Sequence, residues 1–114
     1  MFIKKSKAII EPFANGKIFD YRLPDENIGI SYQEYANGRA PTKGWAVNKI
    51  CYEIYFIVDG KAEVFLDNEH EYVEKGDLVI IKPKQKIYFI VDNLKMITIT
   101  QPNFYYEQYE EVGV

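Results

Sequence analysis

The stretch Cys51-Tyr52-Glu53-Ile54-Tyr55-Phe56-Ile57-Val58-Asp59-Gly60 is rich in aromatic and β-branched residues and ends in a dipeptide that favours tight turns. We therefore expect a strand over residues 50–58 and, as the clearest hairpin in the chain, a return through Asp59-Gly60 into residues 62–66. A second stretch, Gly76-Asp77-Leu78-Val79-Ile80-Ile81-Lys82-Pro83, has the same character and predicts a further strand.

The rest of the chain also indicates β-structure. Aromatic residues make up 16% of the sequence, and no segment keeps a helical period over three turns. Short apolar segments alternate with turn residues, which is typical of a sandwich or barrel. The expected strands cover residues 8–13, 17–21, 29–35, 50–58, 62–67, 71–73, 77–81, 87–91 and 94–100.

Two segments lack a clear strand pattern. Residues 37–49 form the longest of them, and we expect a loop there, a kind of segment that is often functional in compact domains. Residues 105–111 alternate tyrosine with acidic residues and predict either a last helical turn or an edge strand.

Length and charge limit the classes of function. The chain has 114 residues, which indicates one domain that buries roughly two thirds of its unfolded surface. Its net charge of -3 disfavours nucleic acid as a partner, and the single cysteine excludes an internal disulfide. No apolar run approaches the ~20 residues of a membrane helix, and the first residues do not form a secretory signal. We expect a cytoplasmic protein with no membrane partner.

The two opening stretches resemble the two sequence motifs of the cupin superfamily. Glu53 and Gly60 have the spacing of the last two positions of the first motif, and Gly76, Asp77 and Pro83 match the second, with the proline displaced by one residue. The resemblance implies an all-β fold, a double-stranded β-helix (jelly-roll) barrel of cupin type. It implies a single domain over residues 1–114, with the motif region at about 29–104 and N-terminal strands within 8–21. Because this fold supports many unrelated activities, the resemblance predicts the fold far better than the function.

The resemblance also shows which residues are missing. Cupins usually hold a metal on three histidines and a glutamate, and here only Glu53 stands at such a position. The histidine positions fall at Ala46 or Val47, at Asn48 or Lys49, and at Ile87. Residues 38–53 further resemble a subgroup of small bacterial cupins that lack the paired histidines. We therefore expect no metal and no other cofactor, with an apolar wall replacing the metal site; an iron oxygenase would need ligands that this pattern does not supply.

Glu53 is the main candidate for a functional side chain. Strand alternation places it on one face with Cys51 and Tyr55, and the resemblance turns that face toward the barrel interior, where Ile87 and Phe89 also point. A buried carboxylate is costly unless it is protonated, paired with a cation such as Arg39, or hydrogen-bonded to tyrosine or asparagine side chains. Glu53 could bind a ligand hydroxyl or act as a general acid/base; alternatively, it could tie the 37–49 segment to the barrel.

The predicted ligand-binding set consists of Glu53, Asn48, Tyr55, Cys51, Arg39 and Trp45. Arg39 could clamp an anion or tether its loop, and Trp45 could stack on a sugar or pack against the core. Cys51 has no histidine nearby in the sequence to activate it, so we expect it to act as a small apolar residue.

Two functions remain open from the sequence. The first is a binding protein for a small polar molecule, a sugar or a carboxylate, without a catalytic metal. The alternative is a metal-independent sugar isomerase or epimerase that uses Glu53 and a tyrosine as acid and base, although the absence of a histidine base counts against it. We also expect a homodimer, because the open edge of the strand at residues 8–13 invites pairing.

Overall fold

The computed structural model describes residues 1–113, and almost all of its regular structure is β-strand. The strands are β1 (Ile9–Phe13), β2 (Gly16–Tyr21), β3 (Gly29–Ala40), β4 (Trp45–Asn48), β5 (Tyr52–Leu66), β6 (Glu69–Glu74), β7 (Leu78–Ile81), β8 (Lys86–Gln101) and β9 (Tyr109–Val112). Two single-turn 3-10 helices, η1 (Lys5–Lys7) and η2 (Tyr106–Gln108), are the remaining elements. Within residues 1–113, no helix has the length and apolar character needed to span a membrane.

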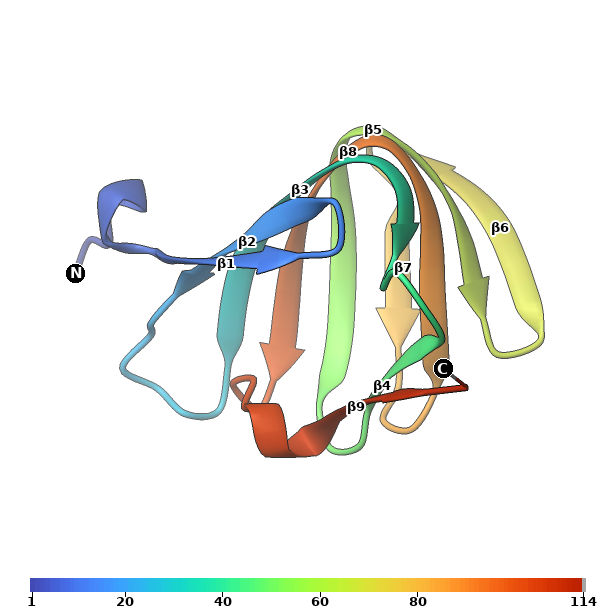
Figure 1. Ribbon diagram of the computed structural model, residues 1–114. Coiled ribbons are helices and arrows are strands. Elements are labelled where there is room, and N and C mark those ends of the chain that lie inside the picture. The colour runs from blue at the N-terminus through green and yellow to red at the C-terminus, as the bar shows by residue number, and fades with distance from the viewer. Residues whose placement is uncertain (114) are drawn as a thin grey trace.

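Three long strands form the frame of the barrel. β8 pairs antiparallel with β3 on one side and with β5 on the other along most of its length. β1 and β2 extend the sheet beyond β3, while β6 and β7 pair with the two ends of β5. Figure 1 shows β3, β5 and β8 arching over the top of the molecule, so that each contributes to both walls of the barrel. The all-β jelly-roll fold expected from the sequence is thus confirmed.

The predicted hairpin at Asp59-Gly60 is wrong. β5 runs through this dipeptide without reversing, and its register with β8 shifts on both sides of Asp59, as at a β-bulge. Gly60 has a φ of +80°, the positive backbone angle that the sequence pattern had predicted for a turn. A bulge and a tight turn need the same backbone freedom, so the local sequence does not distinguish them.

Two other turn-like dipeptides behave in the same way. Asn37-Gly38 lies inside β3, and Asp92-Asn93 lies inside β8. Asp92 pairs with Asn37 on one side and with Lys61 on the other, so the three dipeptides meet across neighbouring strands. We call residues 37–38, 59–60 and 92–93 the corner, because the long strands bend there from one wall of the barrel to the other (Figure 1).

The segment expected as a loop at residues 37–49 is largely strand. It contains the end of β3 and all of β4, which pairs with β8 and with β9. Both alternatives for the C-terminal segment are present, since η2 leads directly into β9. β1 pairs with β2 alone within the described chain, and the homodimer expected at its edge remains a prediction.

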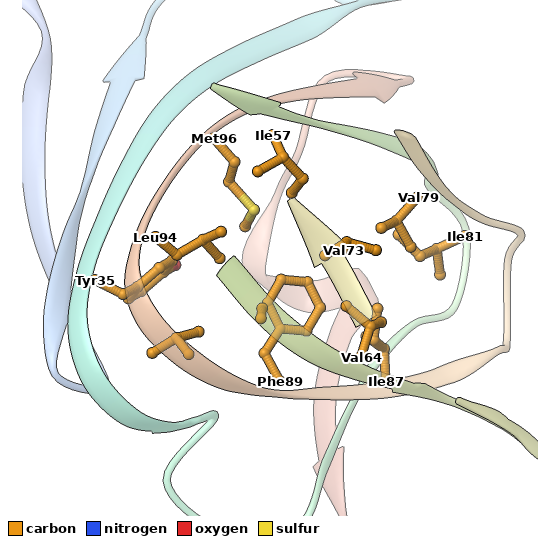
Figure 2. Close-up of a cluster of buried hydrophobic side chains, with 12 residues drawn as sticks. Tyr35, Ile57, Val64, Val73, Val79, Ile81, Ile87, Phe89, Leu94 and Met96 are labelled. Carbon is orange, nitrogen blue, oxygen red and sulfur yellow. The ribbon is translucent and has the colours of Figure 1, made fainter. Parts of the chain in front are cut away.

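The core fills the part of the barrel enclosed by β5, β6, β7 and β8. Ile57, Ile81 and Leu94 are fully buried at its centre, and Figure 2 shows their side chains converging with Val64, Val73 and Phe89. The inward direction expected for Ile87, Phe89 and Val91 is confirmed by their burial. Four core residues, Tyr35, Ile87, Phe89 and Met96, also line the cavity described next.

Candidate functional site

A cavity of about 130 Å³ lies inside the barrel, beside the apolar core. Its wall is drawn from β1, β2, β3, β4, β5 and β8, together with residues near η2. Uncharged or acidic polar side chains reach it from β3, β4, β5 and β8: Ser31, Gln33, Tyr35, Asn48, Glu53, Tyr55, Thr98 and Thr100. A space of this size admits several water molecules or part of a small organic ligand.

Glu53 is the buried carboxyl group of this cavity. It is 5% exposed, and its Oε1 accepts hydrogen bonds from the Asn48 amide and from the Tyr55 hydroxyl at 3.2 Å. Burial raises the pKa of Glu53 to about 7, against a smaller lowering by the Tyr55 hydrogen bond. The sequence left three ways to accommodate this carboxyl group: protonation, a cation such as Arg39, or hydrogen bonds to tyrosine or asparagine. The structure supports hydrogen bonding and a raised pKa, and Arg39 is not in the cavity wall.

Asn48 is held in place by Gln108, which the sequence did not single out. Gln108 is 1% exposed, and its Oε1 accepts the backbone N–H groups of Ile50 at 3.3 Å and Cys51 at 3.2 Å. Its amide nitrogen therefore faces Asn48 and donates to Oδ1 at 2.6 Å. This contact in turn directs the Asn48 amide nitrogen at Glu53, so η2 orients a donor toward the buried carboxyl group.

A second polar chain lies on the neighbouring strands β3 and β8, where Thr98 pairs with Tyr55. The Tyr35 hydroxyl donates to Gln33 Oε1, and the Gln33 amide nitrogen donates to Thr98 Oγ1 at 2.8 Å. Burial raises the pKa of Tyr35 well above its usual value, with Glu53 as a second cause. Neither residue was expected in the site. Strand alternation along β3 places both on one face, but the sequence alone does not reveal which face of β3 turns toward the barrel interior.

The structure brings only part of the predicted set to the cavity. Glu53, Asn48 and Tyr55 meet there. Cys51 is fully buried behind it, and its thiol donates to the Pro102 carbonyl at 3.5 Å. Burial, as the larger cause, and the nearby charge of Glu53, as the smaller one, raise the pKa of Cys51 to about 11. The group is therefore a thiol at neutral pH and a poor nucleophile.

Arg39 and Trp45 lie on the outer face of the barrel. Both contact Tyr88, which alternates along β8 with the inward residues Ile87 and Phe89 and therefore points outward. The Arg39 guanidinium is 4.0 Å from the centre of the Tyr88 ring and donates to the Pro41 carbonyl at 2.8 Å. The Trp45 ring meets Tyr88 edge-on at 4.6 Å. The structure therefore does not place Arg39 and Trp45 in one site with Glu53, contrary to the predicted ligand-binding set.

The residues at the metal-ligand positions of the cupin motifs do not fit a transition metal. Ala46, Asn48 and Ile87 line the cavity where the resemblance places histidines, beside Glu53. One carboxylate and one amide, with no imidazole, make a poor donor set. No cluster of three or more histidine, cysteine, aspartate or glutamate side chains able to hold a metal occurs within residues 1–113. The expected lack of a cofactor remains a prediction.

The fold and the interior cavity define a cupin-type β-barrel. Among solved structures, the chain is similar to Pac13, described as a nucleoside dehydratase, with a TM-score of 0.88 and 15% identity over 98% of this chain and 90% of that one. A Streptomyces PAC13 variant with uridine is similar to the same degree, at 0.88 and 16%. Oxalate decarboxylase from Bacillus subtilis has a TM-score of 0.84 at 15% identity, and the match covers 96% of this chain but 31% of that one.

These likenesses establish the fold and nothing finer, because the sequence identities are so low. No protein-family model matches the chain, and no curated protein matches it either.

Proposed function

We propose that this protein binds a small, neutral, hydroxyl-bearing molecule, such as a sugar or the sugar part of a nucleoside, in the cavity beside Glu53. The observation that carries the proposal is that only one of the two carboxyl oxygens of Glu53 accepts hydrogen bonds within the described chain. Both of its hydrogen bonds within the described chain go to Oε1, so Oε2 remains able to accept a hydrogen bond from a ligand. A buried carboxyl group that lacks a cation gains most from such a ligand.

The charge of the cavity favours a neutral ligand over the carboxylate left open by the sequence. Three acidic residues, Glu11, Asp20 and Glu53, belong to its wall, and the wall residues within positions 1–113 include no lysine, arginine or histidine. An anionic ligand would meet repulsion in a medium of reduced dielectric constant. Pac13 is described as a nucleoside dehydratase, and the structure of a Streptomyces PAC13 variant is described with uridine. Both descriptions are compatible with a neutral hydroxyl-bearing ligand in this type of barrel.

A ligand screen tests this proposal. We expect neutral sugars and nucleosides at millimolar concentration to raise the melting temperature, because a bound ligand stabilises the folded state. Sugar phosphates and sugar acids should give no such shift. The best compound should bind at least about tenfold more weakly to Glu53→Gln, the loss typical of a hydrogen bond to a charged group. Glu74→Gln, an exposed glutamate of β6, is the matched control. Binding of anions alone, or equal binding to Glu53→Gln, would contradict the proposal.

An acid–base enzyme is the second candidate, and the pKa of Glu53 is the observation that favours it. A carboxyl group with a pKa of about 7 can both take up and release a proton at neutral pH. Tyr55 shares Oε1 with Asn48 and is positioned as a partner. In an isomerase or epimerase, Glu53 would remove a proton from the carbon next to a carbonyl group and return it to a neighbouring carbon or to the opposite face.

Proton exchange would reveal this activity. If Glu53 is the base, a bound sugar incubated in deuterated water with the wild-type protein should exchange a carbon-bound hydrogen for deuterium, as followed by NMR. The exchange rate should rise with pH and level off above about pH 7. Glu53→Gln should reduce the rate by about a hundredfold or more, the scale of general base catalysis. Undiminished exchange by that variant would exclude Glu53 as the base.

A further inference from the structure

We infer that Thr100, Gly29 and Asn103 form a diol-recognition subsite next to Glu53, an inference that rests on the proposed function and specifies its ligand. The subsite would bind two hydroxyl groups on adjacent carbons of a neutral sugar. Thr100 and Asn103 belong to the cavity wall with Glu53.

The first argument is register. Thr100 of β8 pairs directly with Glu53 of β5, so the two side chains lie on the same face of the sheet. Both are 5% exposed, yet no hydrogen bond joins them. The hydroxyl group of Thr100 and the carboxyl group of Glu53 thus belong to neighbouring residues but do not form a hydrogen bond with each other.

The second argument is the unsatisfied hydroxyl group of Thr100. Its Oγ1 is the single buried side-chain polar atom in residues 1–113 without a hydrogen-bond partner. Thr98, two residues earlier on the same face, has its hydroxyl group bonded to Gln33 at 2.8 Å. Buried polar groups almost always have a partner. Thr100 Oγ1 is covered in the ligand-free protein, so a ligand hydroxyl group would have to displace the packing around it to supply the missing hydrogen bond.

The third argument is the close approach of Thr100 and Asn103 to Gly29. This glycine pairs with Thr100 from β3. A Cβ atom at this position would lie 2.6 Å from Thr100 Oγ1 and 2.5 Å from Asn103 Oδ1, so any other residue would clash with both polar atoms and displace them. The same Cβ would lie 3.2 Å from the Asn103 Cα, so glycine also lets the segment after β8 approach. A glycine within a strand often marks such a close approach.

The chemistry of these atoms matches a diol. One ligand hydroxyl can donate to Glu53 Oε2 while it accepts a hydrogen bond from Thr100. Its neighbour can donate to Asn103 Oδ1, a carbonyl oxygen that accepts but cannot donate. Loss of the first hydroxyl leaves the buried Glu53 and Thr100 unpaired, and loss of the second leaves the half-buried Asn103 without its donor. Sites that hydrogen-bond ligand hydroxyl groups discriminate against deoxy analogues.

A pair of matched variants tests the state of the two threonines without any ligand. Thr100→Val should raise the melting temperature of the ligand-free protein by a few degrees, because it removes an unpaired buried hydroxyl group. Thr98→Val should lower it, because the Gln33 amide loses the shorter of its two hydrogen bonds and keeps only the one to Ser31 Oγ at 3.2 Å. If Thr100→Val instead lowers the melting temperature as Thr98→Val does, the Thr100 hydroxyl has a structural partner and the inference is wrong.

Calorimetric titration tests recognition of the diol. The probes are uridine, D-ribose and methyl α-D-mannopyranoside, each with its deoxy counterpart. We expect at least one diol to bind at least about tenfold more tightly than its deoxy form. Thr100→Val should bring this ratio close to one, and Glu74→Gln, which alters an exposed residue outside the cavity wall, should preserve it. A neutral ligand bound without a diol preference would overturn this inference and leave the proposed function standing. If no neutral compound binds at all, both fail.

Discussion

Replacing Glu53 with glutamine is expected to remove a loss of stability that the wild-type protein undergoes between about pH 5 and pH 8. Burial raises the pKa of Glu53 from 4.5 to about 7 in the folded protein. The folded state therefore binds this proton more tightly than the unfolded state. Its stabilising contribution is complete below about pH 4.5 and is lost as the pH rises through about 7. Glutamine keeps an oxygen for Asn48 and Tyr55 but does not titrate.

The expected size follows from the pKa difference. At about 1.4 kcal/mol per pKa unit, the wild type should lose roughly 2–3 kcal/mol of unfolding free energy over this pH range relative to Glu53→Gln. Urea unfolding at pH 5 and pH 8 measures it. Glu74→Gln, which alters an exposed carboxyl group, should follow the wild-type pH dependence. If the wild type and Glu53→Gln change in parallel with pH, Glu53 does not have a raised pKa.

Gly60→Ala is expected to be the most damaging small substitution in the corner. A Cβ atom at Gly60 would lie 2.0 Å from the backbone oxygen of Asn93, and the φ of +80° is itself unfavourable for alanine. The clash is with the backbone of β8, so it cannot be relieved by a side-chain rotation. We expect a loss of at least about 4 kcal/mol, or failure to accumulate as folded protein.

Gly38→Ala separates the two causes. Gly38 lies in the same corner with a φ of +112°, but a Cβ atom there would meet nothing within 4 Å. Only the backbone strain applies, and the expected cost is about 1–2 kcal/mol. Urea midpoints of the two variants, or soluble yield if Gly60→Ala does not fold, give the comparison. Equal losses would mean that the close approach of β5 and β8 at the corner is not a constraint.

The corner shows how far local sequence can predict this fold. Asn37-Gly38, Asp59-Gly60 and Asp92-Asn93 have the composition of turns, and each contains one residue with a positive φ. Four of the nine expected strands, at residues 50–58, 62–67, 87–91 and 94–100, occupy much of the real β-structure. They are nevertheless halves of two continuous strands, β5 and β8. Whether a strand reverses or bends at such a point depends on the strands beside it, which the local sequence does not specify.

The site was predictable to a similar extent. Motif spacing and alternation were enough to select Glu53. Tyrosine and asparagine side chains were expected as its possible partners, and Tyr55 and Asn48 were placed with it in the predicted ligand-binding set. Gln108 was not, because its burial depends on η2 closing against residues 48–51 from 60 positions away in the chain. Gln33, Tyr35 and Thr100 were missed for the same reason: their roles arise from the pairing of β3, β5 and β8.

By itself, the sequence determined the β-character of the chain, the alternation of side chains between the two faces of each strand and the absence of histidine at the positions that the cupin resemblance assigns to metal ligands. These properties follow from side-chain type and from the two-residue period of a strand. Only the tertiary structure decided what Glu53 contacts, that Arg39 and Trp45 lie outside, and that Thr100 is left unpaired at the cavity. Those properties depend on register between distant strands, and a shift of one residue would turn each side chain to the other face of the sheet.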